Sequence, residues 1–175
     1  MLIFALLAWL IWIIRSREHL SLQSIGFNAG AIGKSLLWGL VGLLMCGAGL
    51  ALALLLLGVL GLKMGGGSEG FVTPTYAVMI VVLRAGIVEE AFFRGYAIER
   101  LTALTHSKAV AVTLPLVLFS LFHYRQGFGG VIVALIMGGV LTGFYLWKRD
   151  LIANMSAHFL VDFIPNVLIP MIGRD

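Results

Sequence analysis

The stretch GIVEEAFFRGYAIERL, residues 86–101, places two adjacent glutamates and an arginine in a strongly apolar chain. Residues four apart on an α-helix share a face, so Glu90 and Arg94 can form an ion pair. Glu89 points about 100° away from Glu90, and the residue four positions after it is the uncharged Phe93. The spacing therefore predicts that Glu89 lacks a charged partner and can act as a general base or acid, supported by Glu90 and Arg94.

A second polar group lies near the end of the chain, in the stretch NMSAHFLVDF. Its polar residues are spaced four apart and so form one stripe on an otherwise apolar helix. Together with a histidine one turn after Phe119, they have the residue types that hold and deprotonate a water molecule. The predicted catalytic residues are Glu89, His123, His158 and Asp162. The predicted supporting residues are Glu90, Arg94, Phe119 and Asn154.

Two histidines and a carboxylate also suit zinc, so His123 and His158 with Glu89 or Asp162 are an alternative set of metal ligands. The pattern His-Glu-x-x-His of many zinc proteases does not occur in the sequence. The single cysteine, Cys46, excludes a disulfide within the chain and is interpreted as a small buried apolar residue. Zinc is therefore a candidate cofactor that the residues do not require.

The chain that positions these side chains is 61% hydrophobic and 11% charged, whereas soluble domains carry roughly 25% charged residues. Its apolar residues occur in long blocks rather than in alternation, which favours membrane helices over barrel strands. The blocks cover residues 2–14, 31–62, 75–103, 109–123, 130–147 and 151–172. We therefore predict an all-α, polytopic transmembrane helix bundle of about six membrane helices, in a single integral-membrane domain over residues 1–175.

Lysines and arginines at the ends of the apolar blocks give the net charge of +4, a distribution that indicates membrane topology rather than nucleic-acid binding. The first, third and fifth links between blocks are richest in these residues, so we expect them in the cytoplasm and both termini outside. Residues 63–74, KMGGGSEGFVTP, are predicted to form a loop. Small residues at helical spacing predict close helix packing at Gly39, Gly42, Gly49, Gly139 and Gly143.

Three motifs in order resemble those of the CAAX prenyl endopeptidase and bacteriocin-processing (CPBP, ABI) family of intramembrane proteases. They are Glu-Glu-x-x-x-Arg ending at Arg94, Phe-x-x-x-His ending at His123, and His-x-x-x-Asn/Asp ending at Asp162. The resemblance covers about residues 75–172, the expected protease-like core, and each motif falls on a separate predicted helix. It implies that Glu90 and Arg94 brace the site.

The same resemblance implies roles for the other matched residues. Glu89 and His123 would activate a water for hydrolysis of a peptide bond, and His158 with its partner at position 162 would stabilise the tetrahedral oxyanion. The more familiar partner is asparagine, and an ionised aspartate would repel an oxyanion. Asp162 is therefore expected to be protonated, to orient His158, or to bind a metal.

The sequence thus predicts an intramembrane endopeptidase, of the metal or the glutamate type, that hydrolyses peptide bonds within the membrane. Its expected partners are membrane lipid and peptide or membrane-protein substrates, with lipidated chains among the candidates. The alternative is a non-catalytic membrane protein, such as a bacteriocin-immunity factor or a small transporter, because buried Glu, His and Asp also form ion relays. The short loops and the absence of targeting signals favour a prokaryotic plasma membrane.

Overall fold

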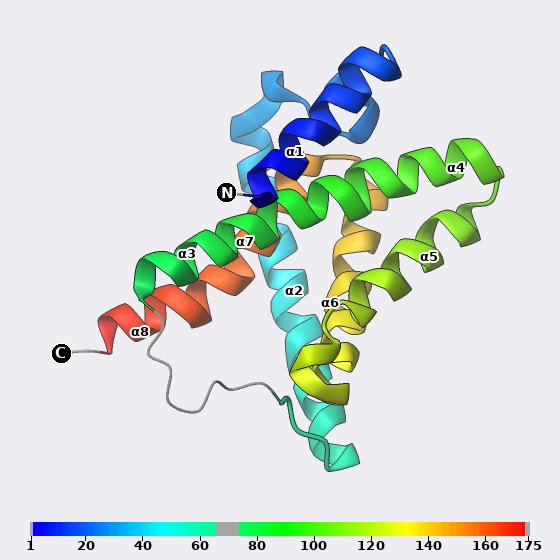
Figure 1. Ribbon diagram of the computed structural model, residues 1–175. Coiled ribbons are helices and arrows are strands. Elements are labelled where there is room, and N and C mark those ends of the chain that lie inside the picture. The colour runs from blue at the N-terminus through cyan, green and yellow to red at the C-terminus, as the bar shows by residue number, and fades with distance from the viewer. Residues whose placement is uncertain (1, 66–73, 174–175) are drawn as a thin grey trace.

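The computed structural model describes residues 2–65 and 74–173, and these residues fold into helices joined by short links (Figure 1). The longer continuous helical segments cover residues 2–17, 29–60, 75–105, 108–121, 124–148 and 151–172, and a short 3-10 helix covers Leu22–Ile25 in the first link. Each predicted apolar block falls on one of these segments, so the all-α prediction is confirmed. The loop predicted at residues 63–74 lies mostly outside the described residues.

Three of the segments are long and apolar enough to cross a membrane. They are Ala29–Leu60, which contains α2 (Ile32–Leu60), Tyr124–Lys148, which contains α6 (Gly127–Lys148), and Leu151–Ile172, which contains α7 (Leu151–Phe163) and α8 (Ile169–Ile172). The others are shorter or carry more charge. They contain α1 (Leu2–Trp12), α3 (Thr75–Arg84), α4 (Glu99–Thr105) and α5 (Lys108–Leu121).

The third segment, residues 75–105, is one continuous helix whose middle is wound more loosely than its ends. Between α3 and α4 it has two π-helical stretches, Ala85–Glu89 and Ala91–Ile98. A π-helical turn hydrogen-bonds residue i to i+5 and is frequently found at functional sites. Glu89 and Arg94 of the first motif therefore lie on wide turns, and Glu90 is the single residue between the two π-helical stretches.

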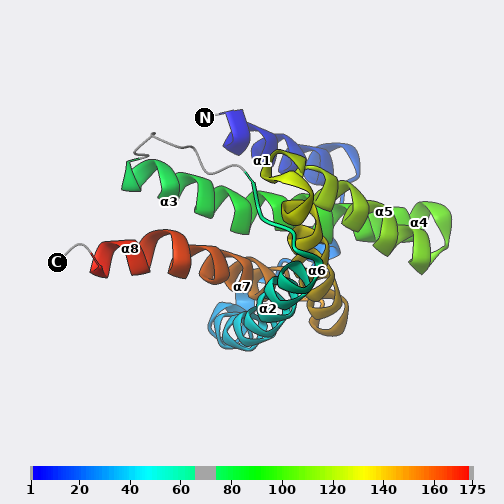
Figure 2. The same ribbon diagram turned by 90° about the horizontal axis from the view of Figure 1, so that it is seen from below.

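In Figure 1, α2 and α6 run side by side in opposite directions, and the α3–α4 and α7–α8 segments cross them; Figure 2 shows the same crossing from below. Small residues allow the close approach of α2 to its neighbours: a Cβ on Gly39 or Gly42 would lie 2.6 or 2.7 Å from a Cβ of α7. A Cβ on Gly49 would lie 2.8 Å from Val140 of α6. The predicted packing through these three glycines is confirmed, and Cys46 is fully buried beside them, as predicted.

The same prediction is wrong for Gly139 and Gly143 of α6. A Cβ at either position would meet nothing within 4 Å in the part of the chain that the structure describes, so neither glycine packs against another described helix. The glycine that packs tightly is the preceding one, Gly138, where a Cβ would lie 2.9 Å from side chains of α5. The spacing of the glycines identified the correct helix but the wrong face.

The links meet in two groups at opposite ends of α2 and α6. The backbone N–H of Leu151, the first residue of α7 and the one directly after the fifth link, donates to the carbonyl of Gly26 in the first link, at 2.9 Å. At the other end, the N–H of Gly65 in the second link donates to the carbonyl of Gln126 in the fourth, at 2.7 Å. The first and fifth links thus share one side, which agrees with the side expected for both from their lysines and arginines.

Candidate active site

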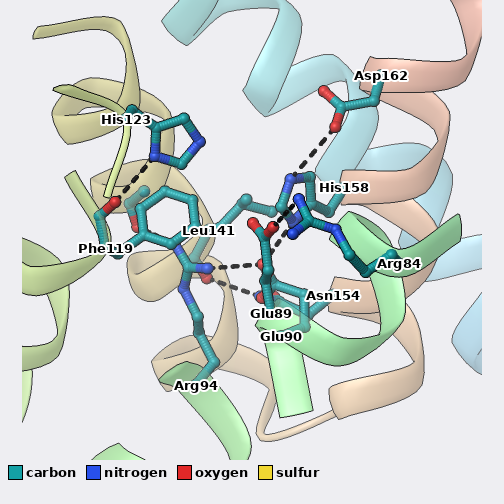
Figure 3. Close-up of polar contacts among 11 residues, drawn as sticks. Arg84, Glu89, Glu90, Arg94, Phe119, His123, Leu141, Asn154, His158 and Asp162 are labelled. Carbon is teal, nitrogen blue, oxygen red and sulfur yellow. Dashed lines mark hydrogen bonds and ion pairs between the residues drawn. The ribbon is translucent and has the colours of Figure 1, made fainter. Parts of the chain in front are cut away.

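Glu90 is completely buried and joins the third helix to α7. Its Oε1 accepts hydrogen bonds from Arg94 Nη1 and from His158 Nδ1, each at 2.7 Å, and its Oε2 accepts one from Asn154 Nδ2 at 2.6 Å (Figure 3). The predicted pair of Glu90 with Arg94 is confirmed. The links to α7 were not predicted, because sequence spacing shows only which residues of one helix share a face.

Arg94 is the largest of the fully buried side chains and is held by more than its ion pair. Its guanidinium carbon lies 4.2 Å from the centroid of the Phe119 ring, a cation–π distance, and its Nη2 donates to the carbonyl of Gly138 at 3.3 Å. A Cβ on Gly138 would lie 2.9 Å from the Phe119 ring and 3.1 Å from Arg94 Nη2. The missing side chain of Gly138 therefore makes the room that the guanidinium fills.

Gly138→Ala is expected to lower the free energy of unfolding by about 1–3 kcal/mol, the usual cost of overpacking a filled interior. Gly139→Ala is the matched control, because it makes the same change at the next position, where nothing lies within 4 Å. Unfolding of the purified variants in mixed micelles measures both. Equal stability of the two variants would show that Gly138 is not needed for the Arg94 position.

A second glycine sets the distance between the third helix and α7. A Cβ on Gly86 would lie 2.8 Å from Phe159 Cβ and 3.0 Å from its backbone nitrogen. Because Phe159 follows His158 directly, this contact between backbones brings the imidazole within reach of Glu90. Sequence reasoning did not identify Gly86, because a single glycine without a second small residue at helical spacing does not show in sequence whether it packs against another helix.

The prediction that Glu89 has no charged partner is wrong. Arg84 Nη2 lies 2.8 Å from Glu89 Oε1, and the two side chains are 35% and 18% exposed. On a regular α-helix, residues five apart point about 140° away from each other. The π-helical turn over Ala85–Glu89 brings such residues closer to one face, so the pairing follows from a backbone feature that α-helical spacing does not anticipate.

Glu89 and His123 line the same cavity, which has a volume of about 660 Å³. Its other walls include Arg84, Arg125 and the aromatic rings of Phe92, Phe93, Phe119 and Phe122. His158 and Asp162 are not among the residues that line it, although the His158 ring centroid lies 6.3 Å from that of Phe119. The structure therefore brings together two of the four predicted catalytic residues at the cavity and places the other two beside it (Figure 3).

The tautomer of neutral His123 follows from its one hydrogen bond. Its Nδ1 lies 2.9 Å from the carbonyl oxygen of Phe119, one turn earlier at the end of α5. A carbonyl oxygen can only accept, so Nδ1 carries the proton and Nε2 carries the lone pair. His123 can therefore accept a hydrogen bond or a proton at Nε2.

The predicted polar stripe on α7 divides into a buried part and a partly exposed part. Asn154 and His158 are buried, whereas the Asp162 side chain is 37% exposed. His158 Nε2 lies 3.5 Å from Asp162 Oδ2, which is longer than a strong hydrogen bond. His158 thus lies between two carboxylates, with Glu90 at Nδ1 and Asp162 at Nε2.

The alternative zinc site was expected from His123 and His158 with Glu89 or Asp162. Across residues 2–65 and 74–173, no three His, Cys, Asp or Glu side chains lie close enough together to hold a metal ion. Both nitrogens of His158 face carboxylates, and Glu89 is paired with Arg84. The candidate ligands as arranged do not fit a zinc ion.

Comparison with protein families gives one match. A family model described as type II CAAX prenyl endopeptidase Rce1-like matches residues 71–164, more than half of the 175 residues. The match contains the glutamates, the arginine and both histidines of the site. Comparison with curated proteins found no match, and comparison with solved structures found none.

Proposed function

The chain belongs to the Rce1-like family of type II CAAX prenyl endopeptidases, and from this membership we propose that it is an intramembrane peptidase in which Glu89 and His123 activate a water. With three helices able to cross a membrane, it is an integral membrane protein. The remaining segments also lie within the bilayer in this proposal, giving about six membrane helices. The membrane is a prokaryotic plasma membrane.

The observation that carries the proposal is that Glu89 and His123 share a cavity. Both present acceptors there: a carboxylate, and the Nε2 lone pair that the Phe119 carbonyl leaves on His123. A water between them donates one O–H to each, which directs its oxygen lone pairs toward a substrate. The water oxygen then bonds to a peptide carbonyl carbon as one of the two bases takes its proton, and that proton later passes to the leaving amine.

His158 and Asp162 serve the oxyanion in this mechanism. Glu90 accepts the Nδ1 hydrogen of His158 and stabilises a positive imidazolium, which then has a second donor at Nε2. Asp162 orients that donor from 3.5 Å, a distance at which a nearer oxyanion can take over the hydrogen bond. Of the three expected roles of Asp162, orienting His158 is therefore the one that the geometry favours.

Arg84 positions Glu89 in this scheme. Its guanidinium fixes Oε1 at the cavity wall and compensates the carboxylate charge in an apolar setting. The aromatic walls then exclude bulk water and fit apolar peptide side chains. Substrates are therefore peptides or membrane proteins that reach the cavity from the bilayer, lipidated chains among them. Protein side chains alone activate the water in this proposal.

The test is cleavage by purified protein in proteoliposomes that carry a library of membrane-anchored reporter peptides. The wild type is expected to cut at one bond, seen as two product masses, and Glu89→Gln is expected to remove the cut. Glu99→Gln is the matched control, since Glu99 lies on the same helix and is also paired with an arginine but does not line the cavity. Cleavage that persists in Glu89→Gln contradicts the assignment, whereas ion flux without cleavage favours a transporter.

A further inference from the structure

A second cavity lies where the first and fifth links meet. Its volume is about 290 Å³, and it is enclosed by the start of α2 and by the turn from α6 to α7. Side chains of Asn28, Lys34, Trp38, Lys148, Arg149 and Asp150 line it. The larger cavity beside Glu89 lies at the beginning of α6, and this one lies at the end of α6. The two are therefore separate sites.

The lining carries a net positive charge. Asp150, its one carboxylate, is already engaged by neutral donors: Oδ1 accepts from the Ala153 N–H at 3.0 Å and Oδ2 from Ser35 Oγ at 2.7 Å. In the described part of the chain, no carboxylate lies within ion-pair distance of Lys34 or Lys148. Two ammonium groups at one cavity attract an anion, and the positive end of the α2 dipole adds to this attraction.

Two tryptophans place the cavity at the depth of lipid headgroups. The Lys148 ammonium lies 3.3 Å from the centroid of the Trp38 ring and 4.5 Å from that of Trp147. The two rings meet edge to face, with centroids 5.3 Å apart, where α2 and α6 pack together. Tryptophans and basic residues at helix ends are characteristic of the interface between membrane and water.

An open apolar surface continues from the tryptophans toward the middle of the membrane. Trp147 is 59% exposed. Gly143 and Gly139 lie four and eight residues before it on the same face of α6, and both have open space beside them. On α2, the exposed Val41 lies one turn after Trp38, toward the middle of the membrane. A positive cavity next to an exposed apolar surface matches the two parts of one amphipathic molecule.

We propose that this cavity binds the phosphate of an anionic phospholipid headgroup, with an acyl chain lying along the surface formed by Gly139, Gly143 and Trp147. Lys34 and Lys148 hold the phosphate. Basic pockets between membrane helices are a known arrangement for anionic lipid headgroups. The glycines, which pack against no other helix among the described residues, leave the acyl chain its space. This site is independent of the proposed peptidase activity.

Native mass spectrometry of the purified protein titrated with dioleoylphosphatidylglycerol tests the proposal. The double variant Lys34→Gln/Lys148→Gln is expected to weaken retention of that lipid roughly thirtyfold, from the usual effect of two lysines at an anionic membrane surface. Lys63→Gln/Lys108→Gln removes the same charge from other links and is expected to change retention less than twofold. Lys34→Gln alone leaves the contact of Lys148 with both tryptophans intact. This single variant keeps the test valid if the double variant misfolds.

Three further measurements decide the source of the phosphate and the role of the glycines. Dioleoylphosphatidylcholine should bind at least tenfold more weakly than dioleoylphosphatidylglycerol. The Gly143→Leu variant should bind dioleoylphosphatidylglycerol more weakly than the wild type and should not form dimers. Inorganic phosphate or glycerophosphate that binds as tightly as the lipid overturns the lipid assignment in favour of a soluble anion. A Gly143→Leu variant that changes oligomeric state but not lipid retention overturns the acyl-chain assignment in favour of a contact between copies.

Discussion

Glu90→Gln is expected to lower the free energy of unfolding by about 3–5 kcal/mol, the usual cost of breaking a buried ion pair by removing one partner. Three donors converge on the Glu90 carboxylate, which is 0% exposed. Glutamine has the same shape but no charge, and its amide group must face one of those donors with hydrogens of its own. Arg94, 1% exposed, is then left buried without a counter-charge. Unfolding in mixed micelles measures the loss.

Glu99→Gln is the control for this stability effect, because it makes the same change about two turns later on the same helix. Glu99 itself is 12% exposed, but its partner Arg149 is 58% exposed, and a glutamine oxygen can still accept the 2.9 Å hydrogen bond that the Tyr145 hydroxyl donates to Glu99. The loss of charge is therefore expected to cost no more than about 1 kcal/mol. Adding Arg94→Met to Glu90→Gln should recover part of the stability, since it removes the uncompensated charge. A Glu90→Gln variant as stable as the Glu99→Gln control would show that Glu90 does not hold the third helix to α7.

The arrangement of apolar blocks and the pairing of Glu90 with Arg94 were predictable because each depends on neighbours along the chain. Long apolar runs fix helices in a membrane, and i,i+4 spacing fixes which side chains share a face. Contacts between helices depend on how closely their two backbones approach each other. Gly86 and Gly138 set that approach, but an isolated glycine looks the same in sequence whether it packs or faces lipid. Gly138 and Gly139 are adjacent glycines, yet a Cβ would be in close contact at Gly138 and in open space at Gly139.

The partner of Glu89 could not be predicted for a different reason. Pairing with Arg84 requires the wide turn over Ala85–Glu89, whereas the prediction assumed a regular α-helix throughout. The hydrogen bond from His158 to Glu90 also changes how the third motif, His158 with Asp162, is understood. His158 was expected to act with Asp162, and the structure makes Glu90 its nearer partner. The second glutamate therefore supports both the arginine and the histidine.

Glu89→Gln and His123→Gln are each expected to lower kcat/KM for a cleaved reporter peptide by about 10²–10⁴, the usual contribution of a general base. The double variant is expected to be no slower than about the slower single variant. Both side chains bind one water in the proposed mechanism. Once either acceptor is lost, the water is no longer activated, so loss of the other acceptor lowers kcat/KM little further. Single-turnover cleavage of the four proteins, all folded to the same thermal stability, measures the coupling.

Arg125→Gln is the control for this cycle, because Arg125 lines the same cavity on the same link as His123 but offers no base. It is expected to change KM and to leave kcat within about threefold, a result that separates binding of the peptide from activation of water. Losses for Glu89→Gln and His123→Gln that multiply in the double variant would mean that the two residues act in different steps. The shared water would then be wrong, although the cavity could still bind the peptide.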